Sequence, residues 1–384
     1  MDKKVSVGIL TYHRAYNNGA YLQACALCNR LNEESELVAE VIDFQTENEK
    51  THYDITGNSV IWKTKRIIQR KYFLLRKQMH AYDRAINDPI MKRSKEYLRS
   101  NSIETFEKFV KGKYDVIVVG SDEVWKVNNF RGFPNPYWLI GDLNCKKFSY
   151  AASARVEFRK VLPSEKLAIL ENAIKDFDFI SVRDEKTKGE LEELKATNLT
   201  IHKCCDPSFV YDFNISQINA IEKVKRESKF KNDKKTVVVI VGKKEIAEKI
   251  RKDLGKDFNI LALTYYHKGY INVANITPLE WLSIIRDADF VISSLFHAAC
   301  FSIVQKTPFI SVEERRMVDS KLDELLDDEL LRERYISDWT CVEDFSILIR
   351  DLFLCYGFEE FANKKRKSFQ VFLDALKEQC LSKV

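Results

Sequence analysis

The sequence has no run of apolar residues long enough to cross a membrane. A spanning helix needs roughly 18 or more apolar residues in succession, and no window of the 384-residue chain approaches that length. The first residues, MDKKVSVGIL, combine charges with an apolar stretch that is shorter than that of a signal peptide. We therefore expect a cytoplasmic protein.

Motifs that mark several protein classes are missing as well. The chain has no HExxH, no second CxxC and no acidic cluster with ligand spacing, so we expect no metal. It has no Walker A motif and no GxGxxG, and the missing GxSxG elbow argues against a hydrolase triad. The net charge of +5 is spread along the chain and no nucleic-acid motif appears, so we expect no nucleic acid partner. This mild positive charge suits an anionic small ligand or an anionic membrane surface.

Cysteine is present nine times, an odd number that favours thiols in a reducing compartment. Cys25 and Cys28 form a CxxC, but they lie in AYLQACALCNRL, an apolar pattern with helical spacing. We expect both to be small buried apolar residues. A redox pair is the alternative.

The order of the predicted elements indicates an α/β fold with two domains. A strand at KVSVGILTY, a helix at AYLQACALCNRLNEE and a strand at AEVIDF form a βαβ opening, which is typical of a parallel sheet. The alternation restarts at KTVVVIVG after a charged segment. We expect two Rossmann-like domains with mainly parallel sheets that face each other across a cleft. The expected ranges are an N-terminal domain over 1–213, a linker over 214–235, a C-terminal domain over 236–340 and C-terminal helices over 341–384.

A polar, basic and helical insertion covers about residues 47–112 of the first domain. Its segment IWKTKRIIQRKYFLLRKQMHAYDRAI mixes Lys and Arg with large apolar side chains. A basic amphipathic helix can lie on an anionic membrane surface, but such stretches are more often surface helices packed on their own domain. We favour the second interpretation and keep peripheral membrane contact through residues 63–77 as a hypothesis.

Polar residues gather where the predicted strands end, which is where open α/β sheets bind ligands. The loop after the first strand contributes Thr11, His13, Asn18, Gly19 and Gln23. Gly19 allows close approach to the backbone, and the following helix start offers N–H groups to an anion. An Asn cap of that helix is the simpler alternative.

Two further strand ends carry candidate residues. The strand DVIVV is followed by Gly120, Ser121, Asp122 and, shortly after, Trp125. Asp122 is a candidate base for a sugar hydroxyl, and a cap of the next helix is the alternative. Arg183 follows the strand FDFISV and would either clamp a carboxylate or phosphate or pair with a carboxylate of the protein.

The segment DADFVISSLFHAACFSI places Ser293, Ser294 and His297 between a buried strand and an apolar helix. The N-terminus of a helix favours an anion, and a histidine there can donate to a phosphate or transfer a proton. A structural histidine is the alternative.

Six segments together resemble the polysaccharide pyruvyl transferase family in their order and spacing. They are GILTYHRAYNNGAYLQACAL, YDVIVVGSDEVW, KKFSYAASA, FDFISVRDE, CDPSFV and DADFVISSLFHAACFSI, and the resemblance runs from about Val5 to about Leu326. It implies a fold similar to the GT-B glycosyltransferases, with the acceptor on the N-terminal domain and the donor on the C-terminal domain. It also implies transfer of a pyruvyl group from phosphoenolpyruvate to a sugar or lipid-linked oligosaccharide, as a ketal, in surface polysaccharide synthesis and without a further cofactor.

The chain departs from the family pattern at Glu123, Leu295 and Ala298, where the family commonly has Gln, in some members Arg, and Gly. Without an Arg at position 295, donor binding falls to other arginines or to backbone N–H groups. The resemblance then implies the catalytic residues His297 and Asp122, with His297 as phosphate ligand or proton donor. The expected donor-binding residues are Arg183, Ser293, Ser294, Arg315 and Arg316, and the expected acceptor-binding residues are Thr11, His13, Asn18, Gly19, Gln23, Gly120, Ser121 and Trp125.

Two other functions remain open from the sequence. The first is a GT-B-like glycosyltransferase that uses a nucleotide sugar, because the fold class serves both reactions. The second is a non-catalytic relative that binds a glycan or an anion, which the departures at Glu123 and Leu295 would favour.

Overall fold

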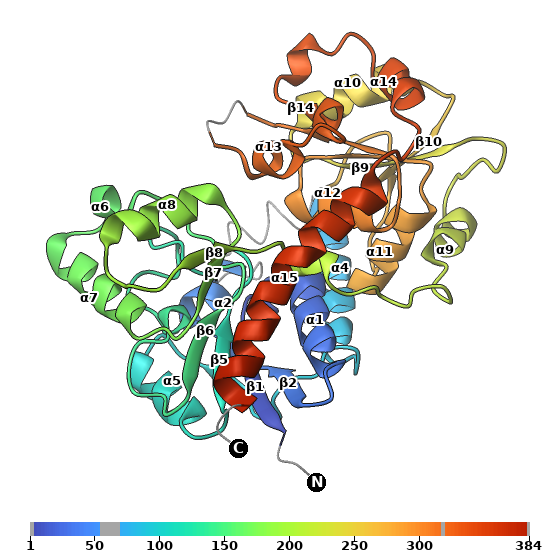
Figure 1. The fold of residues 1–384 in the computed structure, drawn as a ribbon. Helices are drawn as coiled ribbons and strands as arrows, with labels where there is room; N and C mark the ends of the chain where they lie inside the picture. The colour runs from blue at the N-terminus through green and yellow to red at the C-terminus, as the bar shows by residue number, and fades with distance from the viewer. Residues whose placement is uncertain (1–3, 54–69, 316–318, 382–384) are drawn as a thin grey trace, which may run out of the picture. The chain divides into compact units, whose positions relative to one another are not determined.

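The computed structural model describes residues 4–53, 70–315 and 319–381, and the chain forms two compact units. Unit 1 comprises Met1–Asn58, Asp88–Tyr211 and Lys365–Val384, and unit 2 comprises Ser59–Asn87 and Asp212–Lys364. Each unit is built on a parallel sheet flanked by helices (Figure 1). The expected α/β class with mainly parallel sheets is therefore confirmed.

The sheet of unit 1 has the order β2-β1-β5-β6, and all of its pairs are parallel. Its strands are β1 (Val5–Leu10), β2 (Leu37–Val41), β5 (Val116–Val119) and β6 (Lys146–Ser149). The four residues of β5, all Val or Ile, are buried, as expected for a strand covered on both faces. Two short parallel pairs complete the unit: β3 (Phe44–Gln45) with β4 (Leu98–Arg99), and β7 (Ile180–Val182) with β8 (Ile201–Lys203).

The helices of unit 1 cover this sheet, and α1 lies beside β2 (Figure 1). The last helix, α15 (Phe358–Leu381), begins in unit 2 and ends in unit 1. There Phe372 contacts the rings of Tyr150 and Phe179, so apolar burial fixes the C-terminal half of the helix. The remaining helices of unit 1 are α1 (Asn18–Asn32), α2 (Glu47–Tyr53), α5 (Ile103–Val110), α6 (Phe158–Val161), α7 (Ser164–Lys175), α8 (Glu185–Leu194) and the 3-10 turns η1 (Pro136–Trp138) and η2 (Pro207–Phe209).

The sheet of unit 2 has the order β11-β10-β9-β12-β13-β14 and is parallel throughout. Its strands are β9 (Thr236–Ile240), β10 (Asn259–Ala262), β11 (Ile271–Asn272), β12 (Phe290–Ser293), β13 (Phe309–Val312) and β14 (Tyr335–Ile336). The helices are α4 (Arg70–Ile86), α9 (Ala220–Glu227), α10 (Lys244–Leu254), α11 (Pro278–Asp287), α12 (Phe296–Val304), α13 (Lys321–Leu326), α14 (Phe345–Asp351) and the 3-10 turns η3 (Arg332–Arg334) and η4 (Trp339–Cys341). Thr277 caps α11 in a capping box with Glu280, and Pro278 is the first residue of the helix.

The units divide the chain differently from the expected ranges. The expected linker contains α9, which packs on α11 within unit 2. The expected basic insertion is also divided, because α4 belongs to unit 2. The Gln78 amide donates to the carbonyl of Thr264, and Arg84 donates to the side chain of Asn275. Hydrogen bonds therefore join α4 to segments that are distant in the sequence, and reading along the chain does not reveal these contacts.

The structure bears on the expectations for the cysteines, but only on part of the segment expected to contact a membrane. Residues 54–69, which include much of the basic stretch, lie outside the described residues. Among the residues that the structure does describe, no helix combines the length and apolar composition that crossing a membrane requires. Cys25 and Cys28 are buried in α1, and no disulfide links the nine cysteines, all of which lie in the described ranges.

Candidate functional site

Buried polar side chains connect the ends of β1 and β5 in unit 1. The hydroxyl of Thr11 donates to the carbonyl of Ser121 at 3.0 Å, and the amide of Gln23 donates to the Thr11 hydroxyl at 3.0 Å. All three residues are 0% exposed. The sequence correctly places them together at one sheet edge, but their hydrogen bonds hold the strand ends to each other. Because the three side chains are fully buried, they stabilise this sheet edge and are not part of its exposed surface.

The start of α1 corrects the expectation for Asn18 and Gly19. Asn17, not Asn18, is the N-cap, and its side chain accepts from the backbone N–H groups of Gly19 and Ala20 at 3.0 and 3.2 Å. These N–H groups are therefore already satisfied by the cap. The simpler alternative of an Asn cap therefore holds, with Asn17 as the cap.

His13 belongs to a cluster around Asp43, a residue that the sequence did not single out. The His13 ring contacts the Asp43 carboxylate through Nε2 at 3.0 Å, and Arg14 donates to it twice, at 2.6 and 2.8 Å. Arg93 donates to the same carboxylate. Burial alone would raise the pKa of Asp43, but the hydrogen bonds from His13 and Arg14 lower it below its ordinary value. The cluster fixes the loop after β1 and places two arginines beside it.

Asp122 and Arg183 meet in unit 1 with a third residue, Asp206. Arg183 donates to Asp206 at 2.9 Å, and its guanidinium lies 3.7 Å from Asp122. The side chains of Arg183, Asp206 and Asp122 are 5%, 0% and 14% exposed. Burial by itself would lower the pKa of Arg183, but Asp206 and Asp122 raise it above its ordinary value.

In this arrangement Arg183, which was expected to grip the donor, pairs with carboxylates of the protein. Its charge is already matched by two carboxylates of the protein, which is the alternative that the sequence left open. Asp122, by contrast, is partly exposed at the end of β5. No helix follows it, since the next helical turn is η1, so it is not a helix cap. Its φ of 78° lies in the left-handed region that non-glycine residues seldom adopt.

Gly120 and Trp125 are fixed by packing. A Cβ on Gly120 would lie 2.3 Å from the carbonyl oxygen of Tyr150, and the φ of Gly120 is +114°. Only glycine fits both conditions. Trp125 is 0% exposed, stacks on Trp138 at 5.0 Å and donates its indole N–H to the carbonyl of Tyr137. This burial corrects the expectation that Trp125 lines the acceptor site.

In unit 2, the ends of β9, β12 and β13 bring a second set of polar groups together. Ser293 is buried, and its hydroxyl accepts from the backbone N–H of Leu295 at 2.9 Å. Leu295 is the N-cap residue that precedes α12. The Ser294 hydroxyl donates to the carboxylate of Glu314 at 2.6 Å, and the backbone N–H of Gly242 donates to the same oxygen. The sequence placed Ser294 here but missed Gly242 and Glu314. Applying the strand-end rule to β9 and β13 would have found both.

His297 lies in the first turn of α12, 9% exposed, with its ring 5.5 Å from that of Phe296. Another buried histidine, His267, contacts the carbonyl of Val241 through Nε2 at 2.7 Å. Arg315 is exposed just beyond β13, and Arg316 lies outside the described residues. The catalytic candidates thus belong to different units, with Asp122 in unit 1 and His297 in unit 2.

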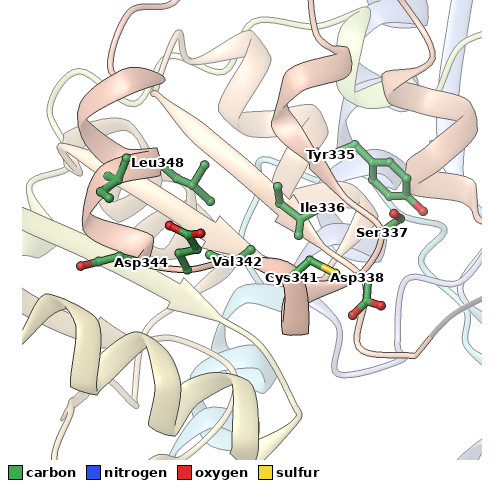
Figure 2. A pocket seen from close by; sticks show the side chains of 10 residues that line it. Tyr335, Ile336, Ser337, Asp338, Cys341, Val342, Asp344 and Leu348 are labelled. Atoms are coloured by element: carbon green, nitrogen blue, oxygen red, sulfur yellow. The ribbon is translucent and has the colours of Figure 1, made fainter.

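A pocket of about 520 Å³ opens elsewhere in unit 2, between β14, η4 and α14 (Figure 2). Its apolar lining includes Ile336, Val342 and Leu348, and its charged lining is acidic, including Asp338 and Asp344. None of the predicted site residues lines it. Acidic walls repel a phosphorylated donor, so this pocket does not suit phosphoenolpyruvate. Among the described residues, no group of three or more His, Cys, Asp or Glu is placed to hold a metal ion.

Comparison with known proteins yields a family and a fold. The family model for polysaccharide pyruvyl transferase matches residues 17–315. No curated protein matches the chain. The structure is similar to the UDP-GlcNAc 2-epimerase from Neisseria meningitidis bound to UDP-GlcNAc (TM-score 0.55, 12% identity, covering 98% of this chain and 100% of that one). It is also similar to a putative UDP-N-acetylglucosamine 2-epimerase from Listeria monocytogenes (TM-score 0.52, 10% identity, 98% and 96% covered). At these identities the likeness establishes a GT-B-like fold and nothing about the substrate.

Proposed function

Because the chain belongs to the polysaccharide pyruvyl transferase family, we propose that it transfers a pyruvyl group from phosphoenolpyruvate to a sugar and closes a ketal across two hydroxyl groups. The observation that carries this proposal is the family match over residues 17–315, which includes the polar residues after β5 in unit 1 and after β9, β12 and β13 in unit 2. We also propose a cytoplasmic location, which the odd number of cysteines favours. A lipid-linked oligosaccharide is one acceptor of this class.

The reaction makes definite demands on the protein. A proton adds to the methylene carbon of phosphoenolpyruvate, and a sugar hydroxyl forms a bond to the neighbouring carbon and loses its proton. Phosphate then leaves that carbon, and a second hydroxyl takes its place and loses its proton. The products are the ketal and inorganic phosphate. The protein must therefore supply an acid, a base and donors for a carboxylate and a phosphate.

We assign these roles to residues at the strand ends. His297, in the first turn of α12, is the proton donor or the ligand of the phosphate, because an imidazole can transfer a proton or donate to an anion and the helix N-terminus favours an anion. Asp122 is the base that accepts the proton of the sugar hydroxyl. Arg183, 3.7 Å from Asp122, positions that carboxylate and is itself held by Asp206. Ser294 and the backbone N–H of Gly242 are donors for the phosphoenolpyruvate anion.

Thermal unfolding with and without phosphoenolpyruvate tests the proposal without knowledge of the acceptor. A ligand at about 100 times its dissociation constant adds roughly 2.7 kcal/mol of stability, which corresponds to a rise of roughly 5–10 °C for a unit of this size. We expect this rise in the wild type and a smaller one in His297→Ala. The control is His80→Ala, which removes an exposed histidine of α4 in the same unit.

Two outcomes count against the proposal. If phosphoenolpyruvate leaves the transition unchanged while a nucleotide sugar raises it, the chain is a glycosyltransferase. If phosphoenolpyruvate binds but incubation with candidate glycans releases no phosphate, the chain is a binding relative without catalysis.

A further inference from the structure

The donor set at the strand ends of unit 2 already holds an anion, which is the side chain of Glu314. Since β9, β12 and β13 are parallel neighbours, the residues that follow them meet at one edge of the sheet. Ser294 Oγ and the Gly242 N–H both donate to Oε1 of Glu314, at 2.6 Å for Ser294. The ammonium of Lys243 lies 3.2 Å from the carbonyl oxygen of Glu314. A hydroxyl, a backbone N–H and a cation are the groups that bind carboxylates and phosphates in proteins.

The missing side chain of Gly242 makes this contact possible. A Cβ on Gly242 would lie 3.2 Å from each oxygen of the Glu314 carboxylate. The carboxylate therefore lies against the backbone of the glycine, as close as a bound ligand would. Gly242 is exposed and Glu314 is half-buried, so the position is open to solvent.

The neighbouring Glu313 shows what a structural glutamate looks like at this place. Glu313 is 7% exposed, and its carboxylate accepts from the hydroxyls of Ser320 and Tyr335. Among residues 4–53, 70–315 and 319–381, the groups that donate to the Glu314 carboxylate are Ser294 and Gly242 at the open sheet edge. If Glu314 were removed, water would reach the Gly242 N–H and the Ser294 hydroxyl, so no buried group would lose its partner.

We propose that the Glu314 carboxylate occupies the subsite for the donor's anionic group and must be displaced when the donor binds, so that Glu314 sets the affinity for the donor. This inference rests on the proposed function for the identity of the donor. Two carboxylates cannot share one hydroxyl and one N–H without repulsion. The displaced Glu314 stays tethered next to the site and continues to repel the ligand.

Isothermal titration calorimetry with three probes tests this inference: phosphoenolpyruvate, pyruvate as a carboxylate alone, and inorganic phosphate. We expect Glu314→Gln to bind phosphoenolpyruvate about tenfold more tightly than the wild type, and Glu314→Ala at least as tightly, because one nearby like charge is removed. The control is Glu248→Gln, an exposed glutamate of α10 whose loss changes the net charge equally. It should change the affinity by less than about twofold, because exposed charges are screened by salt.

A second background separates competition at this subsite from a general charge effect. In the Ser294→Ala background the subsite lacks its hydroxyl. Adding Glu314→Gln to this background should therefore increase the affinity for phosphoenolpyruvate by less than it does in the wild type. The titrations with pyruvate and with phosphate identify which anionic group uses the subsite, because only the probe that carries this group should bind Glu314→Gln more tightly than the wild type.

The outcomes distinguish this inference from the proposed function. If phosphoenolpyruvate binds and Glu314→Gln behaves like Glu248→Gln, the inference is wrong and the proposed function stands. If Glu314→Gln binds pyruvate or phosphate more tightly than the wild type does, while phosphoenolpyruvate does not bind, the inference that Glu314 occupies an anion subsite is supported and phosphoenolpyruvate is not the donor. If no form of the protein binds any of the three anions, both are wrong.

Discussion

The buried ion pair between Arg183 and Asp206 predicts a large loss of stability in Asp206→Asn. The pair has a separation of 2.9 Å and side-chain exposures of 5% and 0%. In the wild type, the Asp206 oxygen Oδ1 accepts from the Ser208 N–H and hydroxyl, and Oδ2 accepts from Arg183. Asparagine keeps one oxygen for Ser208 but turns an NH₂ group toward the guanidinium. Breaking a buried pair by neutralising one partner costs about 3–5 kcal/mol.

For a unit of this size, that loss corresponds to a fall of roughly 6–20 °C in the melting temperature of unit 1. The matched control is Asp142→Asn, which makes the same chemical change in an exposed pair with Lys111 at 2.9 Å in the same unit. Exposed pairs contribute about 0–1 kcal/mol, so the control should melt close to the wild type. Circular dichroism or calorimetry measures both variants. Equal melting temperatures for the two variants would refute the view that Arg183 depends on its buried partner.

Three further predictions concern other positions. The lowered pKa of Asp43 stabilises the fold above its unfolded pKa of about 4, and this contribution is lost as the pH falls toward the folded pKa. Urea unfolding from pH 6 to pH 3 should therefore show a flatter decline in Asp43→Asn than in the wild type, and parallel declines would contradict this. Gly120→Ala should destabilise unit 1 by about 3 kcal/mol or more, because it adds a clash to backbone strain. Gly112→Ala, at a positive φ with no atom within 4 Å of its Cβ, should cost less. With a thiol reagent at pH 8, exposed Cys341 should react first, whereas burial raises the pKa of Cys28 to about 12 and should protect it until unfolding; a fast phase that survives Cys341→Ser would be evidence against this.

Much of the fold could be predicted because its signals are local. Continuous runs of Val and Ile predicted the buried strands β5 and β9. A Thr followed by Pro is likewise a local signal for the start of a helix, and Thr277 and Pro278 stand at the start of α11. The apolar helical spacing around Cys25 and Cys28 gave a buried face of α1. Each of these features depends on periodicity or capping within one segment, which tertiary contacts here reinforce.

The candidate site could be predicted only in part. The rule that ligands bind beyond strand ends correctly located Thr11, Ser121, Asp122 and Ser294 at two sheet edges. It could not say whether a polar side chain at such an edge faces a ligand or another part of the protein. Arg183 illustrates this, because its partner Asp206 lies in another segment of the sequence and only the fold brings the two together.

The sequence by itself determined the α/β class, the parallel sheets, the family and the sheet edges that carry polar residues, because these depend on short patterns and their order. Only the tertiary structure decided which segments share a unit, as with α4, and which polar groups are matched within the protein, as with Asp43, Asp206 and Glu314. The physical reason is that burial and charge pairing depend on neighbours in space. An Asp or Glu is written with the same letter in the sequence whether its carboxylate pairs with a buried arginine or lies where a ligand could bind, so the sequence alone does not distinguish the two cases.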